Sequence, residues 1–164
     1  ALKNDVDIVR FRKKRTGCFD LTETVFGVNV YEVESISEVV SKCGQLVDEG
    51  KTVLVDYKIE DNEFNDTKRF LDGMRRAFNS IEVLATLSSL HSEQVSRNFL
   101  SRYKNLLNGS VVSFVDSCVD FGTLFNLSES FPELPYKFFG TGKIIPEDIE
   151  SATAERILDG IFNF

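Results

Sequence analysis

The sequence has few of the residues from which disulfide frameworks and metal sites are built. Its three cysteines, Cys18, Cys43 and Cys118, lie far apart and are odd in number. This usage is typical of reduced thiols in a cytoplasmic protein. There is one histidine, His91, and no Cys-x-x-Cys pair, so the usual zinc-binding patterns are excluded and we expect no metal site.

Long apolar runs and an excess of positive charge are also missing. No run approaches the roughly 18–20 apolar residues that a membrane helix needs, and no secretory signal opens the sequence. We therefore expect membrane contact to be peripheral at most. The net charge of −7 argues against general nucleic-acid binding, so we predict no nucleic-acid partner.

The pattern Gly-x-x-x-x-Gly-Lys-Ser/Thr, which cradles nucleotide phosphates with backbone N–H groups and a lysine, does not occur. The length of 164 residues, with 42% apolar and 27% charged residues, is that of one globular domain with a core of its own. We predict a single domain over residues 1–164. Because the first residue is alanine, we expect this domain to be part of a longer architecture.

Short β-rich runs alternate with longer amphipathic segments along the chain. Strands are predicted at 7–11, 28–33, 52–55, 81–87, 111–115 and 136–139, and helices at 19–26, 36–49, 65–79, 93–107, 121–131 and 152–162. Ser35 and Ser92 are predicted N-caps, and Gly50 is predicted to end a helix. The alternation predicts an α/β fold with a mostly parallel, doubly wound sheet of about six strands flanked by helices.

Four polar segments follow predicted strands, at the end of a parallel sheet where ligands bind. They are the basic run 10–15, Asp56, Asp116 and the segment Gly140-Thr141-Gly142. An aspartate at this place can hold a magnesium-bound water or the donors of a guanine edge, or it can simply cap a turn. The glycine-rich segment can pack on a base or phosphate, or serve as an ordinary strand exit.

Within the basic run, Arg12, Lys13 and Lys14 are candidate anion-binding residues. A phosphate group or an acidic patch of a protein partner would suit them, and a solvated charged loop is the alternative. We expect any such binding to be weak and salt-sensitive, because an exposed ion pair is worth only about 1 kcal/mol in water.

The segment 134–150, Leu-Pro-Tyr-Lys-Phe-Phe-Gly-Thr-Gly-Lys-Ile-Ile-Pro-Glu-Asp-Ile-Glu, resembles the closing loop of the signal-recognition-particle GTPases. The flagellar-targeting member of that family is the nearest match. The residues that fit the family pattern are Pro135, Gly142, Pro146, Glu147, Asp148, Ile149 and Ala152.

Upstream segments resemble the same family but depart from it at the nucleotide motifs. Residues 111–116 resemble the strand that ends in Thr-Lys-x-Asp, with Asp116 kept, Ser113 for the threonine and Phe114 for the lysine. Residues 54–58 keep only Asp56 of the Asp-Thr-Ala-Gly turn. In 10–21, Phe11 and basic residues stand where the family has its magnesium- and phosphate-facing residues.

The resemblance implies a P-loop-NTPase-like G domain that lacks its phosphate loop. If nucleotide binding is retained, GTP or GDP is the cofactor. The resemblance then assigns its binding to Asp56, Ser113, Asp116, Gly140, Thr141 and Gly142. It implies no catalytic residue, because nothing remains to stabilise charge on a transferred phosphate.

We therefore predict a degenerate GTPase-like domain that acts as a binding or regulatory module in protein targeting, or in flagellar or secretion assembly. Its partner would be a protein, in a homo- or heterodimer, bound through the ancestral nucleotide face. The alternative is a GTP-binding targeting GTPase whose phosphate loop lies upstream of residue 1.

Overall fold

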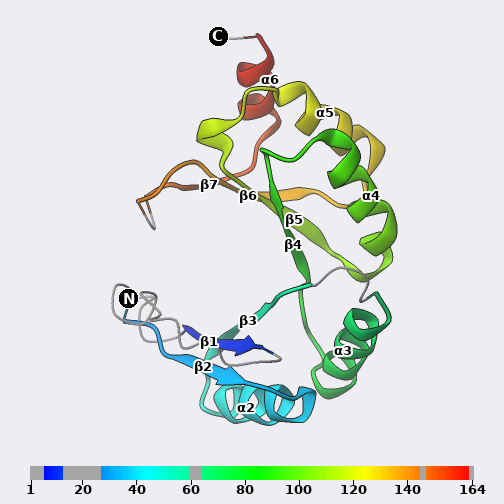
Figure 1. The fold of residues 1–164 in the computed structure, drawn as a ribbon. Helices are drawn as coiled ribbons and strands as arrows, with labels where there is room; N and C mark the ends of the chain where they lie inside the picture. The colour runs from blue at the N-terminus through cyan, green and yellow to red at the C-terminus, as the bar shows by residue number, and fades with distance from the viewer. Residues whose placement is uncertain (1–5, 13–26, 60–63, 145–146, 163–164) are drawn as a thin grey trace. The chain divides into compact units, whose positions relative to one another are not determined.

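The computed structural model describes residues 6–12, 27–59, 64–144 and 147–162 (Figure 1). The chain forms two compact units, Ala1–Ser80 and Ile81–Phe164, each with its own sheet and helices. The helix predicted at 19–26 lies outside the described residues, as do Lys13 and Lys14.

The first unit is built on a three-stranded sheet in the order β2-β1-β3, with both strand pairs parallel. Its elements are β1 (Val6–Phe11), β2 (Val30–Val33), α2 (Ile36–Asp48), β3 (Thr52–Tyr57) and α3 (Phe64–Ala77). In this unit α2 packs on β1 and β3, and α3 contacts α2. Helix α2 therefore serves as the crossover that the parallel strands β2 and β3 require.

Both ends of α2 are fixed by local hydrogen bonds. The Ser35 hydroxyl accepts from the Glu38 N–H at 3.2 Å, and the Glu38 carboxylate accepts in turn from the Glu34 N–H at 3.1 Å. At the other end Gly50 has φ +78°, and the Lys51 N–H donates to the Leu46 carbonyl at 3.0 Å. The predicted cap at Ser35 and the predicted stop at Gly50 are thus confirmed.

Alternation along β1 and β3 divides the sheet of the first unit into two faces. Phe11 and Tyr57 are register partners and stack at 5.5 Å between ring centroids, with Phe70 of α3 at 4.3 Å from Tyr57. Val9, on the same face, is fully buried. The opposite face carries Arg10 and Asp56, which are also register partners.

The second unit contains a four-stranded sheet in the order β4-β5-β6-β7, in which only the β6–β7 pair is antiparallel. Its elements are β4 (Leu84–Ser88), α4 (Glu93–Tyr103), η1 (Lys104–Leu106), β5 (Gly109–Ser113), η2 (Val115–Ser117), α5 (Phe121–Ser130), β6 (Tyr136–Gly140), β7 (Ile149–Ser151) and α6 (Ala154–Phe162).

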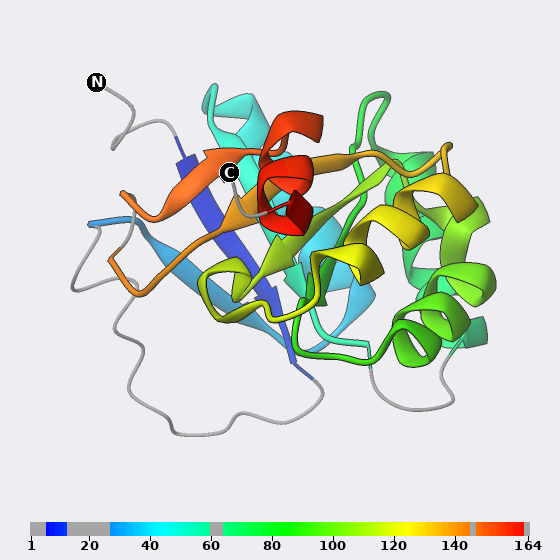
Figure 2. The same cartoon turned by 90° about the horizontal axis from the view of Figure 1, so that it is seen from above.

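One face of this second sheet forms the core beneath the helices. Figures 1 and 2 show α5 between α4 and α6, and both helix pairs are in contact. Leu87 of β4 packs with Leu100 and Leu127 in one cluster, while Val112 and Phe139 belong to a second. Burying these side chains is the main favourable contribution to folding of this unit.

The predicted α/β class and the predominance of parallel strand pairs are confirmed. The predicted single sheet of six strands differs from the structure, in which the described strands form separate sheets of three and four. Alternating strands and helices require parallel crossovers but do not determine which strands hydrogen-bond side by side. The strand Ile149–Ser151 was not predicted, because three residues are too few to show a period.

Most predicted element bounds shift by only a few residues, as is usual for helix and strand ends. The largest difference is at the end of α4, which stops at Tyr103 before the 3₁₀ turn η1, whereas the helix was predicted to reach 107. The strand β5 stops at Ser113 before a second 3₁₀ turn, two residues before its predicted end. None of the helices in the described part of the chain has the length and apolarity needed to cross a bilayer.

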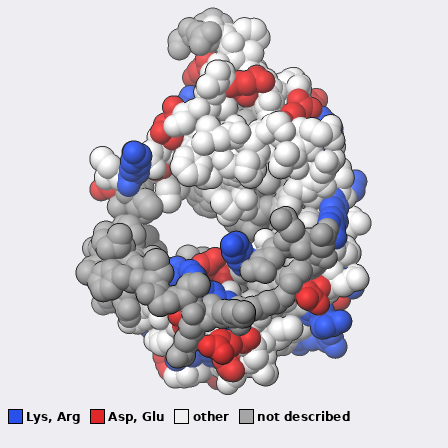
Figure 3. Space-filling model, viewed as in Figure 1, with Lys and Arg blue, Asp and Glu red and all other residues white. Residues whose placement is uncertain are grey.

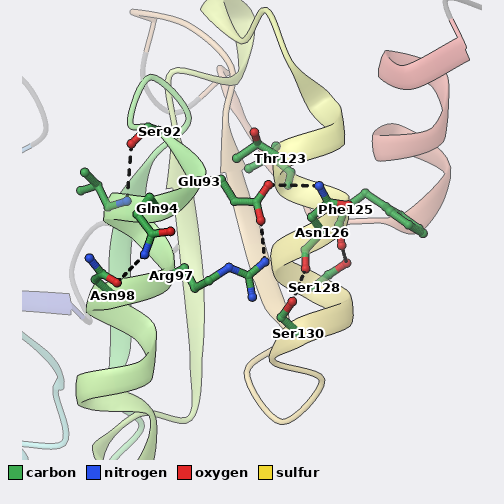
Figure 4. Close-up of polar contacts among 12 residues, drawn as sticks. Ser92, Glu93, Gln94, Arg97, Asn98, Thr123, Phe125, Asn126, Ser128 and Ser130 are labelled. Atoms are coloured by element: carbon green, nitrogen blue, oxygen red, sulfur yellow. Dashed lines mark hydrogen bonds and ion pairs between the residues drawn. The ribbon is translucent and has the colours of Figure 1, made fainter.

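Helices α4 and α5 are joined by a polar contact centred on Glu93 (Figure 4). One carboxylate oxygen accepts from Arg97 at 2.5 Å within α4, and the other accepts from the Asn126 side chain of α5 at 3.0 Å. These hydrogen bonds, from Arg97 first and Asn126 second, lower the pKa of Glu93 below its ordinary value.

We expect Glu93→Gln to lower the free energy of unfolding at neutral pH. A depressed pKa in the folded state stabilises the fold above the unfolded value of about 4.3, and this contribution disappears as pH falls through the folded pKa. The difference between the parent and Glu93→Gln should therefore shrink below about pH 4.3. Urea denaturation at several pH values measures this difference in the free energy of unfolding. Glu155→Gln, at an exposed position of α6, is the control. A difference that stays constant with pH would contradict this role.

Candidate functional site

Ser113, the last residue of β5, lies at the carboxyl edge of the second sheet. The Ser113 hydroxyl donates to the Leu87 carbonyl of β4 at 3.0 Å, and the Ser113 carbonyl accepts from the Ser89 N–H at 3.0 Å. The side chain of Ser113 is therefore used to hold β4 and β5 together at this edge. In a complex with nucleotide, this hydroxyl would have to exchange its partner.

Phe114, immediately after β5, has a left-handed backbone. Its φ is 61° and its ψ is 33°, a conformation that costs a non-glycine residue roughly 1–2 kcal/mol. Its carbonyl accepts from the Ser89 hydroxyl at 2.6 Å and from the Ser117 N–H at 3.1 Å. These bonds fix the turn, and the aromatic side chain remains 55% exposed.

Asp116 lies in the 3₁₀ turn that follows, with its side chain exposed. Its carboxylate accepts a hydrogen bond from the neighbouring Ser117 hydroxyl at 3.1 Å. A carboxylate in this setting has further lone pairs for a ligand with paired N–H donors.

The segment Gly140-Thr141-Gly142 is organised by Asp148. The Thr141 N–H donates to the Asp148 carbonyl at 2.8 Å, and an Asp148 carboxylate oxygen accepts from the Ile144 N–H at 2.6 Å. A Cβ on Gly142 would lie 2.3 Å from an Asp148 carboxylate oxygen, so a side chain there would displace this carboxylate. The Thr141 N–H is therefore already bonded within the loop and is not available to a phosphate.

Gly140 brings this loop beside the end of β5. It is the last residue of β6, and its Cβ position lies 3.6 Å from the Ser113 Cα. The second unit thus places Ser113 and the Gly140–Gly142 loop together at one edge, with Asp116 in the turn that leaves it.

At the carboxyl edge of the first sheet, Asp56 is paired with a cation. Its carboxylate lies 2.7 Å from the Nε of Arg10, the residue opposite it on β1. The Asp56 side chain is half-exposed, whereas that of Arg10 is mostly covered. The pair satisfies the carboxylate across two parallel strands.

Arg12, the first residue after β1, is also held within the first unit. Its N–H donates to the Val33 carbonyl at 3.0 Å, and its Nε lies 3.8 Å from the Glu32 carboxylate. An anion at Arg12 would have to compete with this acidic neighbour. Lys13 and Lys14 lie outside the described residues, so anion binding by the three cations stays a prediction.

The sequence analysis named Arg10 within the basic run and Asp148 among the residues of the family pattern, but it did not predict what their side chains contact. Arg10 stands one residue before the end of β1, as Asp56 does in β3, so parallel register could have suggested the pair. Asp148 stands four residues after Ile144, a spacing at which an aspartate side chain can accept from a backbone N–H and close a turn. This spacing could have suggested its contact.

Solved structures match this arrangement over most of the chain. The chloroplast FtsY of Physcomitrella patens matches with a TM-score of 0.77 at 17% identity, over 98% of this chain and 57% of that one. The fold is that of the signal-recognition-particle GTPases. The FtsY of Elizabethkingia anophelis matches at 0.77 and 16%, over 95% and 56%, and FlhF complexed with GTP and Mg²⁺ at 0.71 and 19%, over 95% and 61%.

The chain spans about three fifths of the length of these three relatives. No model of a protein family matches the sequence, and no curated protein is detectably similar to it. At these identities the likeness concerns the fold, so the chemistry has to be argued from the residues present.

A guanine nucleotide fits these residues only in part. Asp116 is exposed and able to accept from a guanine edge, with the Phe114 ring exposed two residues before it. Asp56 fits a magnesium ion poorly, because the Arg10 guanidinium already neutralises its charge. Taken separately, the edge of the second sheet offers an acceptor for a base, whereas the carboxylate at the edge of the first sheet is already ion-paired.

Proposed function

We propose that the chain is a degenerate GTPase-like domain, in the cytoplasm, that binds a protein partner or regulates one without hydrolysing GTP. The setting would be protein targeting, or flagellar or secretion assembly. The observation that carries the proposal is the Asp56–Arg10 pair at 2.7 Å. It places a cation against Asp56, the carboxylate that the resemblance puts beside the γ-phosphate.

Phosphoryl transfer depends on positioning and on stabilising charge at the phosphate oxygens, mostly with a metal ion and a phosphate loop. The residues of this chain include no phosphate-loop pattern, and Asp56, the one residue kept of the family's Asp-Thr-Ala-Gly turn, is ion-paired. Removing such groups costs orders of magnitude in rate, since their electrostatic contribution is usually the largest one.

Exposed apolar side chains support a protein partner at the edge of the second sheet. Phe114 and Val119 follow β5 and Ile144 follows β6, and all three are exposed. Exposed aromatic side chains such as Phe114 are enriched in protein interfaces. Such a contact would use the ancestral nucleotide face, in a homo- or heterodimer.

The second candidate is a GTP-binding targeting GTPase whose phosphate loop is supplied upstream. The exposed carboxylate of Asp116 favours this candidate. Among the described residues, its one hydrogen bond in the structure is the one it accepts from the Ser117 hydroxyl. FlhF, one of the matching structures, is complexed with GTP and Mg²⁺.

Incubated with GTP and Mg²⁺, the chain should release phosphate no faster than a buffer blank. The reason is that the sequence contains no phosphate-loop pattern to stabilise the transition state, and the Asp56 carboxylate, which could help only by holding the metal ion, is paired with Arg10. A coupled phosphate-release assay at several protein concentrations measures it.

Asp116→Ala is the matched variant for this assay. Phosphate release above the blank that disappears in Asp116→Ala would overturn the proposal. Binding of GTP or GDP without release, lost in the same variant, would keep the absence of hydrolysis and assign the base site to Asp116. Titration calorimetry with each nucleotide, with and without Mg²⁺, separates these results.

A further inference from the structure

Three charged residues stand in one row across the first sheet. Glu32 of β2 and Asp56 of β3 are both register partners of Arg10, which lies between them on β1. Register partners point to the same face of a sheet, so the row lies on the face opposite the buried Val9. Figure 3 shows basic and acidic side chains next to one another on the first unit, in the lower half of the view. The row thus places a cation between two carboxylates.

The cation is the most covered member of this row. The Arg10 side chain is 13% exposed, whereas that of Asp56 is 53% exposed and that of Glu32 is 31% exposed. The Arg10 Nε donates to an Asp56 carboxylate oxygen at 2.7 Å, which is a charge-assisted hydrogen bond. Arginine does not lose its proton in proteins, so this positive charge is permanent. The guanidinium is therefore a fixed part of the sheet surface.

A divalent metal ion does not fit this row. Mg²⁺ and Mn²⁺ prefer carboxylates and other oxygen ligands. At Asp56 such an ion would lie beside the guanidinium as a like charge and would have to displace a short hydrogen bond. Glu32 cannot compensate, because it stands on the other side of Arg10 and lies 3.8 Å from the Nε of Arg12.

We propose that Arg10 is the resident cation of this edge and determines that the first unit binds no divalent metal ion there. One side chain supplies the charge compensation that a metal ion would otherwise bring to Asp56 and Glu32. Arg10 is thus a specificity-determining residue, which makes whatever this edge binds independent of metal. This role rests on the proposed function only in that a metal-free edge cannot supply the ion on which phosphoryl transfer depends.

Mn²⁺ is a suitable probe, because it takes the same oxygen ligands as Mg²⁺ and broadens the NMR signals of nearby amides. In a titration of the parent chain, amides around Asp56 and Glu32 should broaden no more than those around Asp72 on α3. In Arg10→Gln the two carboxylates lose their cation, so the same amides should broaden first. Mn²⁺ should bind there about tenfold more tightly than in the parent. Adding Asp56→Asn to Arg10→Gln should abolish this gain.

Two further variants separate the charge of Arg10 from its shape and from the net charge of the chain. Arg10→Lys keeps a cation at this position and should exclude Mn²⁺ as the parent does. Arg69→Gln removes an arginine that is 73% exposed on α3, and it should leave Mn²⁺ binding around Asp56 unchanged. Because Arg10 is mostly covered, circular dichroism checks that Arg10→Gln is folded. The titration of the parent chain tests the role of Arg10 even where that variant is not.

Four results would overturn this role of Arg10. They are selective broadening around Asp56 in the parent, no gain in Mn²⁺ affinity in a folded Arg10→Gln, a gain that survives Asp56→Asn, and an equal gain in Arg10→Lys or Arg69→Gln. None of them alters the expected absence of phosphate release. Conversely, phosphate release by a chain that shows no Mn²⁺ at Asp56 would overturn the proposed function and leave the resident cation in place.

Discussion

Phe139→Ala should lower the free energy of unfolding by about 3–5 kcal/mol, the range for deleting a fully buried phenylalanine. Phe139 is 0% exposed and packs with Val112, Leu124 and Ile157 beneath α5 and α6. Because these neighbours come from a strand and two helices, they cannot all move in to fill the space. A loss of this size is a large part of the 5–15 kcal/mol that keeps a typical domain folded.

Urea denaturation followed by circular dichroism measures this loss, and Phe138→Ala is its matched control. Phe138 is the preceding residue on β6, is 44% exposed, and points to the other face of the sheet. Its loss should cost clearly less. Similar effects for the two variants would contradict the assignment of Phe139 to the core face.

Phe70→Ala should have a comparable effect in the first unit, about 3–5 kcal/mol. Phe70 is buried on α3 and stacks with Tyr57 at 4.3 Å, while its ring lies 5.6 Å from that of Phe11. Each aromatic pair adds about 0.5–1.5 kcal/mol beyond simple burial, so the variant loses two favourable contacts as well as apolar area.

Denaturation gives the total loss, and amide hydrogen exchange assigns it to a part of the chain. We expect faster exchange in β1, β3 and α3, where the neighbours of Phe70 lie. Arg69→Ala, on the exposed side of the same helix, should change the free energy of unfolding by less than about 0.5 kcal/mol. An equal loss in Arg69→Ala would mean that helix propensity, not aromatic packing, determines the effect.

Local sequence determined the secondary structure of this chain well because the physical causes are local. The helix that starts after Ser35 and ends before Gly50 needs only a side-chain acceptor at one end and a positive φ at the other. Apolar runs such as 52–55, joined by crossover helices, likewise predict that the strands run parallel, although not which strands are neighbours.

The sequence could place the candidate residues near strand ends, because strand ends can be read from it, and the structure has them there. Asp56 is the last residue but one of β3, Gly140 is the last residue of β6, and Asp116 lies in the turn after β5. What their side chains contact could not be read in the same way. Arg10 and Asp56 are 46 positions apart, and only the register of β1 against β3 brings them to 2.7 Å.

Tertiary structure alone decided the features that depend on packing between distant segments. The division of the strands into sheets of three and four follows from lateral hydrogen bonds, which no periodicity encodes. Phe125 of α5 and Leu158 of α6 are 33 positions apart in the sequence, yet they line one hollow between the two helices. Both stay partly exposed, whereas Ile157 beside them is buried. An amphipathic pattern shows that a helix has an apolar stripe, but how much of that stripe is covered is settled by its neighbours in space.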